Sequence, residues 1–174
     1  GYILDSNLIK RNIDLKLSQN NTNNINQDRI YKANNQTNVL KMGTLLREGK
    51  FNDLFNLVGL INQTDPKQKY LRDAEIILEE RLKNDPEDIN NLYAIVISQI
   101  LQKKAFQASK NLDKIIKIDN YNASAYLAKT ITNIYMFNLI SAENNLSKFI
   151  KLNNDDSLSE SSNKLHNFLK ILLF

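Results

Sequence analysis

The stretch RLKNDPEDINNLYAIV, residues 81–96, and the stretch IIKIDNYNASAYLAKT, residues 115–130, follow the same order of apolar and turn residues. Each stretch ends one apolar run, passes through Asp and a short turn, and begins a second apolar run with the spacing of an amphipathic helix. A helix–turn–helix transition made again after about 34 residues indicates an internal repeat, because a single helix pair cannot bury its own apolar face.

The same shift aligns apolar residues near the start of what would be the second helix of each unit. The aligned positions are Ala74, Ala108 and Ala142, and, one turn later, Leu78, Leu112 and Leu146. A small side chain allows two helix axes to approach closely, and a leucine one turn later fills the seam between them. The helix stop recurs as well, as Asp85-Pro86, Asp119-Asn120 and Asn153-Asn154.

This pattern resembles the tetratricopeptide repeat (TPR), a helix–turn–helix unit of about 34 residues. The resemblance is carried by the recurring alanine, by the stop at Asp85-Pro86, and by the turn residues Gly49 and Phe51 of an earlier unit. The period of the chain matches that of the family clearly, whereas many single positions depart from the family's preferred residues. It implies an all-α fold: a short right-handed superhelix of antiparallel helix pairs over residues 35–156, with a capping helix over residues 157–174.

The chain departs from the family pattern in two places. The stops Asp65-Pro66 and Asp85-Pro86 follow each other too closely for a full repeat, so we expect residues 67–84 to hold one helix where the family has two. Strict alignment also puts Lys129 and Asn133 on a buried face. Sliding the first helix of each pair by one residue frees these polar side chains, and we prefer that slid register because it buries apolar residues instead. The residues it buries are Tyr93, Ile97, Ile100, Leu127, Ile131 and Ile134.

Periodicity and breakers together predict the helix boundaries. We expect a helix over residues 37–47 that Gly49 ends in a left-handed turn, a second that begins at Phe51, and a third that stops before Pro86. Further helices are expected at about 88–102, 105–118, 122–136, 139–152 and 157–173. The last of these opens with Ser157 and Glu160 in the spacing of a capping box.

Residues 1–34 are expected to form a separate, flexible, Asn-rich segment. SQNNTNNINQ, residues 18–27, carries one apolar residue in ten and cannot bury enough surface to offset the entropy of ordering, so we expect a flexible linker there. The preceding residues, from Ile3 to Leu17, are apolar enough to dock as a short helix or strand. The alternative is a stub that led to a removed anchor.

Charge and chain start bear on partners and location. The net charge is +4, and Lys and Arg are scattered among acids, so we expect no nucleic-acid binding. No apolar run reaches the roughly 18 residues that span a bilayer. The chain begins with Gly rather than Met. We therefore expect an exported or membrane-anchored protein whose N-terminal leader has been removed.

The residue types needed for catalysis or metal binding are sparse. The chain has no Cys, and its one histidine, His166, lies beside Asn167 without acids nearby in the sequence, so we expect it to be solvated or at an edge. Asp155 and Asp156 are better explained as a helix-connecting turn with an N-cap than as a calcium loop. We expect no enzymatic activity, no catalytic residues, no metal, no cofactor and no small-molecule substrate.

A stack of helix pairs offers a concave groove lined by its first helices. In the slid register this groove would be neutral and built of small residues with an apolar edge. Its residues are Asn91, Ala94, Ser98, Leu101, Ala125, Ala128, Thr132 and Tyr135. In the strict register Tyr93, Ile97, Leu127 and Ile131 would line it instead. Neither register supplies the Lys, Asn and Arg set with which chaperone-adaptor members of the family hold a peptide carboxylate.

Two functional hypotheses follow from this reading. The first is a non-enzymatic protein–protein interaction module that binds a peptide, helix or subunit in the concave groove and supports assembly of a complex. The alternative is a structural homo-oligomerisation domain whose groove is filled by its own N-terminal segment. In that case the apolar finish from Ile171 to Phe174 could dock on a second copy.

Overall fold

The computed structural model describes residues 6–173, except for the side chains of residues 6–9 and 17–23. Every regular element in this range is an α-helix, and the range contains no strand, which confirms the predicted all-α class. The helices are α1 (Ser6–Arg47), α2 (Phe51–Thr64), α3 (Lys69–Asn84), α4 (Ile89–Leu101), α5 (Ala105–Ile118), α6 (Ala123–Tyr135), α7 (Leu139–Leu152) and α8 (Asp156–Leu173). The chain divides into two compact units, residues 1–34 and residues 35–174.

The first unit is helical where the sequence predicts a linker. Helix α1 begins at Ser6 and continues without a break through residues 18–27. The expected flexibility of these residues stays a prediction. A helix makes its backbone hydrogen bonds locally, and no Gly or Pro stands in this stretch to interrupt them. Lys32 and Asp28 add an ion pair of 3.1 Å at i, i+4.

The predicted docking segment from Ile3 to Leu17 belongs to this first unit. Its described side chains, those of residues 10–16, are exposed, including Ile13 and Leu15. Ile3 and Leu4 lie outside the described residues.

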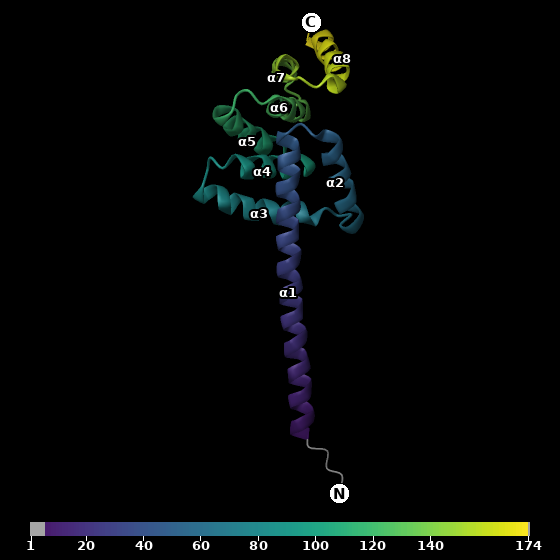
Figure 1. Ribbon diagram of the computed structural model, residues 1–174, viewed down its shortest axis with the longest axis vertical. Coiled ribbons are helices and arrows are strands. Elements are labelled where there is room, and N and C mark those ends of the chain that lie inside the picture. Colours follow the sequence, from purple (N-terminus) through teal and green to yellow (C-terminus); the bar gives the residue numbers. More distant parts are fainter. Residues whose placement is uncertain (1–5, 174) are drawn as a thin grey trace. The chain divides into compact units, whose positions relative to one another are not determined.

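The second unit is a series of helix pairs with the predicted period. The first residue advances from Ile89 in α4 to Ala123 in α6 and from Ala105 in α5 to Leu139 in α7, the same interval that separates the aligned alanines. From α3 onward each helix packs against the next one along the chain (Figure 1). The three aligned alanines and the three aligned leucines are all fully buried, which confirms their predicted place in the core.

Three turns of one type join the two helices within a pair. Each ends the first helix with a residue in the left-handed conformation, at Gly49 (φ 72°), Lys103 (φ 62°) and Phe137 (φ 56°). In each, the residue after it donates its amide to a carbonyl five residues back, the pattern of a Schellman motif. The pairs are thus α1–α2, α4–α5 and α6–α7, and the predicted turn at Gly49 is confirmed.

Turns of a second type separate the pairs. At Asp65, Asp85, Asp119 and Asn153 the residue after the helix donates its amide back to the last turn, and a new helix starts three to four residues later. Two of these turns flank α3, so this helix stands alone between pairs. The prediction of one helix within residues 67–84 is confirmed, because the two closely spaced Asp-Pro steps leave no room for a pair.

The C-terminal part of α1 packs directly on α4. Val39, Met42 and Leu46 belong to the same buried cluster as α4. Between them, a Cβ placed on Gly43 would lie only 2.6 Å from the amide nitrogen of Ala94, so the two backbones are in direct contact. At the end of the helix the Arg47 guanidinium donates to the Asn90 side chain at 2.9 Å. Helix α4 is therefore covered on this side as well, and every residue from 91 to 99 is buried.

The preferred helix register is wrong for α6. Ile131, predicted to be buried, is 38% exposed, whereas Asn133, predicted to be free, is fully buried. The side chain of Lys129 is only 14% exposed and pairs with Asp113 of α5. A lysine can bury its hydrocarbon stem while its ammonium group reaches a partner at the surface. A register chosen to bury only apolar residues therefore puts Lys129 on the wrong face.

In α4 the register makes little difference. Residues of both predicted faces are buried, because α1 covers one side and the helix pairs cover the other.

The start of α8 also differs from the expected capping box. Asp155, two residues before Ser157, accepts the Ser157 amide at 2.9 Å and caps the helix, and Glu160 pairs with Lys164 at 3.0 Å instead. Asp is as good an N-cap as Ser, and using it extends the helix by a residue. The prediction of an N-cap in the Asp155-Asp156 turn is confirmed.

The apolar residues of α8 are only partly buried. Leu169 is buried, whereas Phe168 and Leu172 are exposed. Ser162 is buried as well. Among residues 6–173, no helix combines the length and the apolar character that crossing a bilayer requires.

Replacing Gly43 with Ala is expected to lower the free energy of unfolding by about 2 kcal/mol, because α1 must shift away from the α4 backbone. The matched control is Gly59→Ala in α2, where a Cβ meets nothing within 4 Å. That change is expected to raise stability by about 1 kcal/mol through helix propensity alone. Urea unfolding followed by circular dichroism measures both, and equal effects of the two substitutions would contradict the close packing of α1 on α4.

Phe137→Gly is expected to raise the free energy of unfolding by about 1 kcal/mol, because a bulky residue is strained at positive φ and glycine is not. The Phe137 side chain is 88% exposed, so little packing is lost. Lys103→Gly, at the equivalent turn, should give a similar gain. Thermal unfolding of the two variants checks this, and a loss of stability in both would refute the strain.

Candidate functional site

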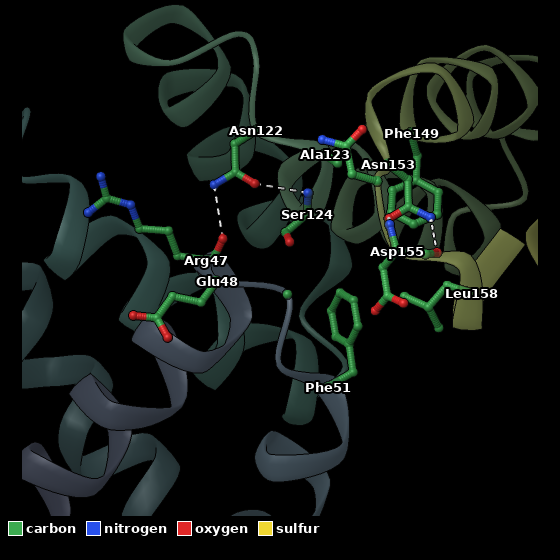
Figure 2. A pocket seen from close by; sticks show the side chains of 12 residues that line it. Arg47, Glu48, Phe51, Asn122, Ala123, Ser124, Phe149, Asn153, Asp155 and Leu158 are labelled. Atoms are coloured by element: carbon green, nitrogen blue, oxygen red, sulfur yellow. Dashed lines mark hydrogen bonds between the residues drawn. The ribbon is translucent and has the colours of Figure 1, made fainter.

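A cleft of about 510 Å³ opens in the second unit beside the end of α1 (Figure 2). Three segments form it: the α1–α2 turn, the first turn of α6, and the end of α7 with the start of α8. Its lining residues are Arg47, Glu48, Gly49, Phe51, Asn122, Ala123, Ser124, Phe149, Asn153, Asn154, Asp155 and Leu158.

Asn122 holds two of these segments together. It is the N-cap of α6, and its side-chain oxygen accepts the Ser124 amide at 3.0 Å. The nitrogen of the same amide group donates to the main-chain carbonyl of Arg47 at 3.1 Å (Figure 2). One side chain therefore satisfies a free donor at the start of α6 and a free acceptor at the end of α1.

Gly49 and Ser124 face each other in the cleft. Gly49 has φ 72°, and a Cβ on it would lie 3.3 Å from the Ser124 hydroxyl oxygen. Ser124 is only 5% exposed, and its hydroxyl makes no hydrogen bond to any residue that the structure describes. Figure 2 shows the Ser124 side chain among the residues that line the cleft. The cleft thus contains a hydroxyl group to which a ligand could hydrogen-bond.

The rest of the lining combines apolar side chains with a polar rim. Phe149 is buried in the core cluster of α6 to α8, and Phe51, Ala123 and Leu158 are half-buried beside the cleft. On the rim, the hydroxyl and the amide of Ser157 hold the pKa of the Asp155 carboxyl below its usual value. Asp155 is therefore ionised at neutral pH.

A second hollow, of about 450 Å³, shares Gly49, Phe51, Asp155 and Leu158 with the first and extends it along the start of α2. Lys50 lines this extension. Its ammonium pairs with Glu48 at 3.0 Å, and the hydrogen bond and the charge of Glu48 raise the pKa of Lys50. Charges of both signs thus surround an apolar centre, a composition suited to a peptide segment.

The described side chains offer little for catalysis in this cleft. The Ser124 hydroxyl has no base within hydrogen-bonding distance among them, and the Asp155 carboxylate is engaged as a helix cap. Over the residues with described side chains, no three His, Cys, Asp or Glu gather in a way that could hold a metal ion.

The sequence suggests that His166 is solvated or at an edge, but the structure places its side chain in a largely buried contact. Its Nε2 lies 2.7 Å from Glu143 Oε1 of α7, and both side chains are largely buried. The two residues are 23 positions apart, so no local pattern connects them.

The residues predicted to line a binding groove are mostly inaccessible. Six of the eight are buried: Asn91, Ala94, Ser98, Ala125, Ala128 and Thr132. Leu101 is half-buried, and only Tyr135 is exposed, at 54%. Ala94 lies against Gly43, so the α4 part of the predicted groove holds residues of α1. The segment that covers the predicted groove comes from residues 35–47, whereas the sequence suggests that Ile3 to Leu17 fill it.

Sequence reasoning missed most of the cleft. Gly49 and Phe51 were identified only as turn residues of a repeat, and Asn122 and Ser124 were not singled out. A signal for Asn122 exists, since it stands one repeat after Asp88, and both residues cap the first helix of a pair. The role of Ser124 has no such signal, because it depends on where the end of α1 lies.

Comparison with protein-family models, with curated proteins and with solved structures found no match for this chain.

Asn122→Ala is expected to lower the free energy of unfolding by about 2 kcal/mol, about 1 from the lost cap and about 1 from the unpaired Arg47 carbonyl. The matched control is Asn138→Ala, which removes the cap of α7 and no link to α1. It should cost about 1 kcal/mol. Chemical denaturation measures the difference, and identical losses in the two variants would show that the link to α1 contributes nothing.

Proposed function

We propose that this chain is a protein–protein interaction module built from TPR-like helix pairs, which binds a peptide, helix or subunit of a partner protein and supports assembly of a complex. The equal advance from α4 to α6 and from α5 to α7 supports this proposal, as do the equivalent turns within three pairs. In a TPR-like stack the first helices of successive pairs form one inner surface.

The observation that carries the proposal is the open cleft beside the covered α4. Residues 35–47 of α1 lie along α4, and the cleft begins where that helix ends, at Arg47. Its half-buried apolar residues, its polar rim and the unpaired Ser124 hydroxyl are features of a site for a peptide or helix end. Partner binding is therefore assigned to this cleft and not to the buried groove residues around Ala94 and Ala128.

A non-enzymatic role agrees best with the chemistry of the cleft. The groups that converge on it are amides, one hydroxyl and a carboxylate that caps a helix. These groups recognise and orient a chain, and they do not form an acid–base pair or an activated nucleophile.

A second candidate function is structural homo-oligomerisation with the groove filled in cis. Two observations favour it: residues 35–47 cover α4, and the outer side of α8 exposes Phe168, Ile171 and Leu172. Light scattering over a range of concentrations separates the two functions. A mass that rises with concentration, and that falls back when Ile171 is replaced by Asp, would favour the oligomer.

Asn154→Trp is expected to abolish partner binding, because it fills the mouth of the cleft without removing a helix cap. Asn154 is exposed, lines the cleft and makes no hydrogen bond among the described residues. The measurement is quantitative mass spectrometry of proteins retained from a source-organism extract by the immobilised full chain. Proteins held by the unmodified chain should be missing from the variant.

The matched control is Asn120→Trp, at the equivalent position one repeat earlier. Asn120 is exposed and lies outside the cleft, and its carbonyl still accepts from the Tyr126 hydroxyl after substitution. This control should retain every partner. Retention of the same proteins by both tryptophan variants would disprove binding at the cleft.

A further inference from the structure

A basic pocket of about 570 Å³ lies at the end of α2 opposite to the cleft. The α2–α3 turn and the first turn of α3 form one wall, and the α4–α5 turn forms the other. Its lining residues are Lys67, Gln68, Lys69, Arg72, Leu101, Gln102 and Lys103. Four of these seven residues are cationic, and no acidic residue lines the pocket.

The four positively charged side chains have no partner among the described residues. Lys67, Lys69, Arg72 and Lys103 are exposed, and none of their side chains makes an ion pair or a hydrogen bond there. The neighbouring Lys104 behaves differently, since its ammonium lies 2.5 Å from the buried Glu75 carboxylate. The pocket therefore keeps an uncompensated positive charge next to a lysine whose charge is neutralised.

The start of α3 carries cations although it already has an acidic cap. The Asp65 carboxylate accepts the Tyr70 amide at 2.9 Å, and the first turn of the helix contains no acidic residue. Lys69 and Arg72 stand at this end of the helix, where cations oppose the helix dipole. An anionic group bound in the pocket would reduce that repulsion.

The pocket also has an apolar component. Leu101 is half-buried between the two walls, and the hydrocarbon stems of the lysines extend the apolar area around it. A small inorganic anion would leave this surface unused, whereas a peptide with acidic residues beside an apolar one would use both parts.

We propose that this pocket binds an acidic peptide segment of a partner protein, with its carboxylates over Lys67, Arg72 and Lys103 and an apolar side chain against Leu101. The proposal rests on the proposed interaction function, for which it names the chemistry of a second contact. A nucleic acid fits less well, since the lining offers no aromatic ring on which a base could stack. Leu101 was predicted as a groove edge, and here it serves a different surface.

The test is fluorescence anisotropy of the full chain with a synthetic peptide in which Glu and Asp flank one Leu. The double variant R72E/K103E should weaken binding by about tenfold or more. The matched control K117E/K170E makes the same change in net charge at exposed lysines outside the pocket and should change affinity less than about twofold. Leu101→Asn should weaken binding of this peptide but not of one with Gly in place of Leu.

Absence of peptide binding, or equal weakening by the two charge variants, would overturn the proposal. So would tighter binding of a single-stranded oligonucleotide than of the peptide, or a self-association that R72E/K103E abolishes. Asn154→Trp should leave the peptide affinity unchanged. If that variant instead removes peptide binding, the acidic segment binds the cleft, so this inference fails while the proposed function stands.

Discussion

The contact between Gly43 of α1 and the backbone of Ala94 in α4 is the constraint on which the second unit depends. Two helix backbones approach this closely only where one residue has no side chain, and the contact then lets Val39, Met42 and Leu46 reach the core. Burial of each such side chain contributes about 1.5–3 kcal/mol. The position of Arg47, the link through Asn122, and the cleft beside them all follow from where this contact puts the end of α1.

The core around α1 and α4 also contains buried polar atoms that lack hydrogen-bond partners. Tyr93 Oη, on α4, is buried without a hydrogen-bond partner in the described part of the chain, as is Asn35 Nδ2 on α1. An unpaired buried polar group costs about 1–3 kcal/mol. Burial raises the pKa of Tyr93 well above its usual value, as the ionised form would be still less favourable there. The apolar gain from α1 must therefore offset these costs, which makes this interface less stable than its buried area alone indicates.

The parts of the structure that sequence predicted well are those set by neighbouring residues. The Asp-Pro steps at Asp65 and Asp85 stop helices by local sterics, and the alanines and leucines at equal intervals fill equivalent places in the core. The groove residues could not be placed, because Ala94 is exposed or buried according to what packs on it. Gly43, a glycine in the middle of a helix, was the available signal. At residues 18–27 composition alone did not indicate the helix, whose backbone hydrogen bonds are local.

Buried tyrosines give this chain an optical signal of its own. It has no tryptophan, so its ultraviolet emission comes from tyrosine. Tyr93 lies fully buried in α4, against which α1 packs, and Tyr70 of α3 is fully buried as well, with burial raising its pKa to about 12. In an alkaline absorbance titration these two rings should ionise after the exposed ones. If α1 moved away from α4, Tyr93 would ionise at a lower pH. The packing of α1 can therefore be followed without a label.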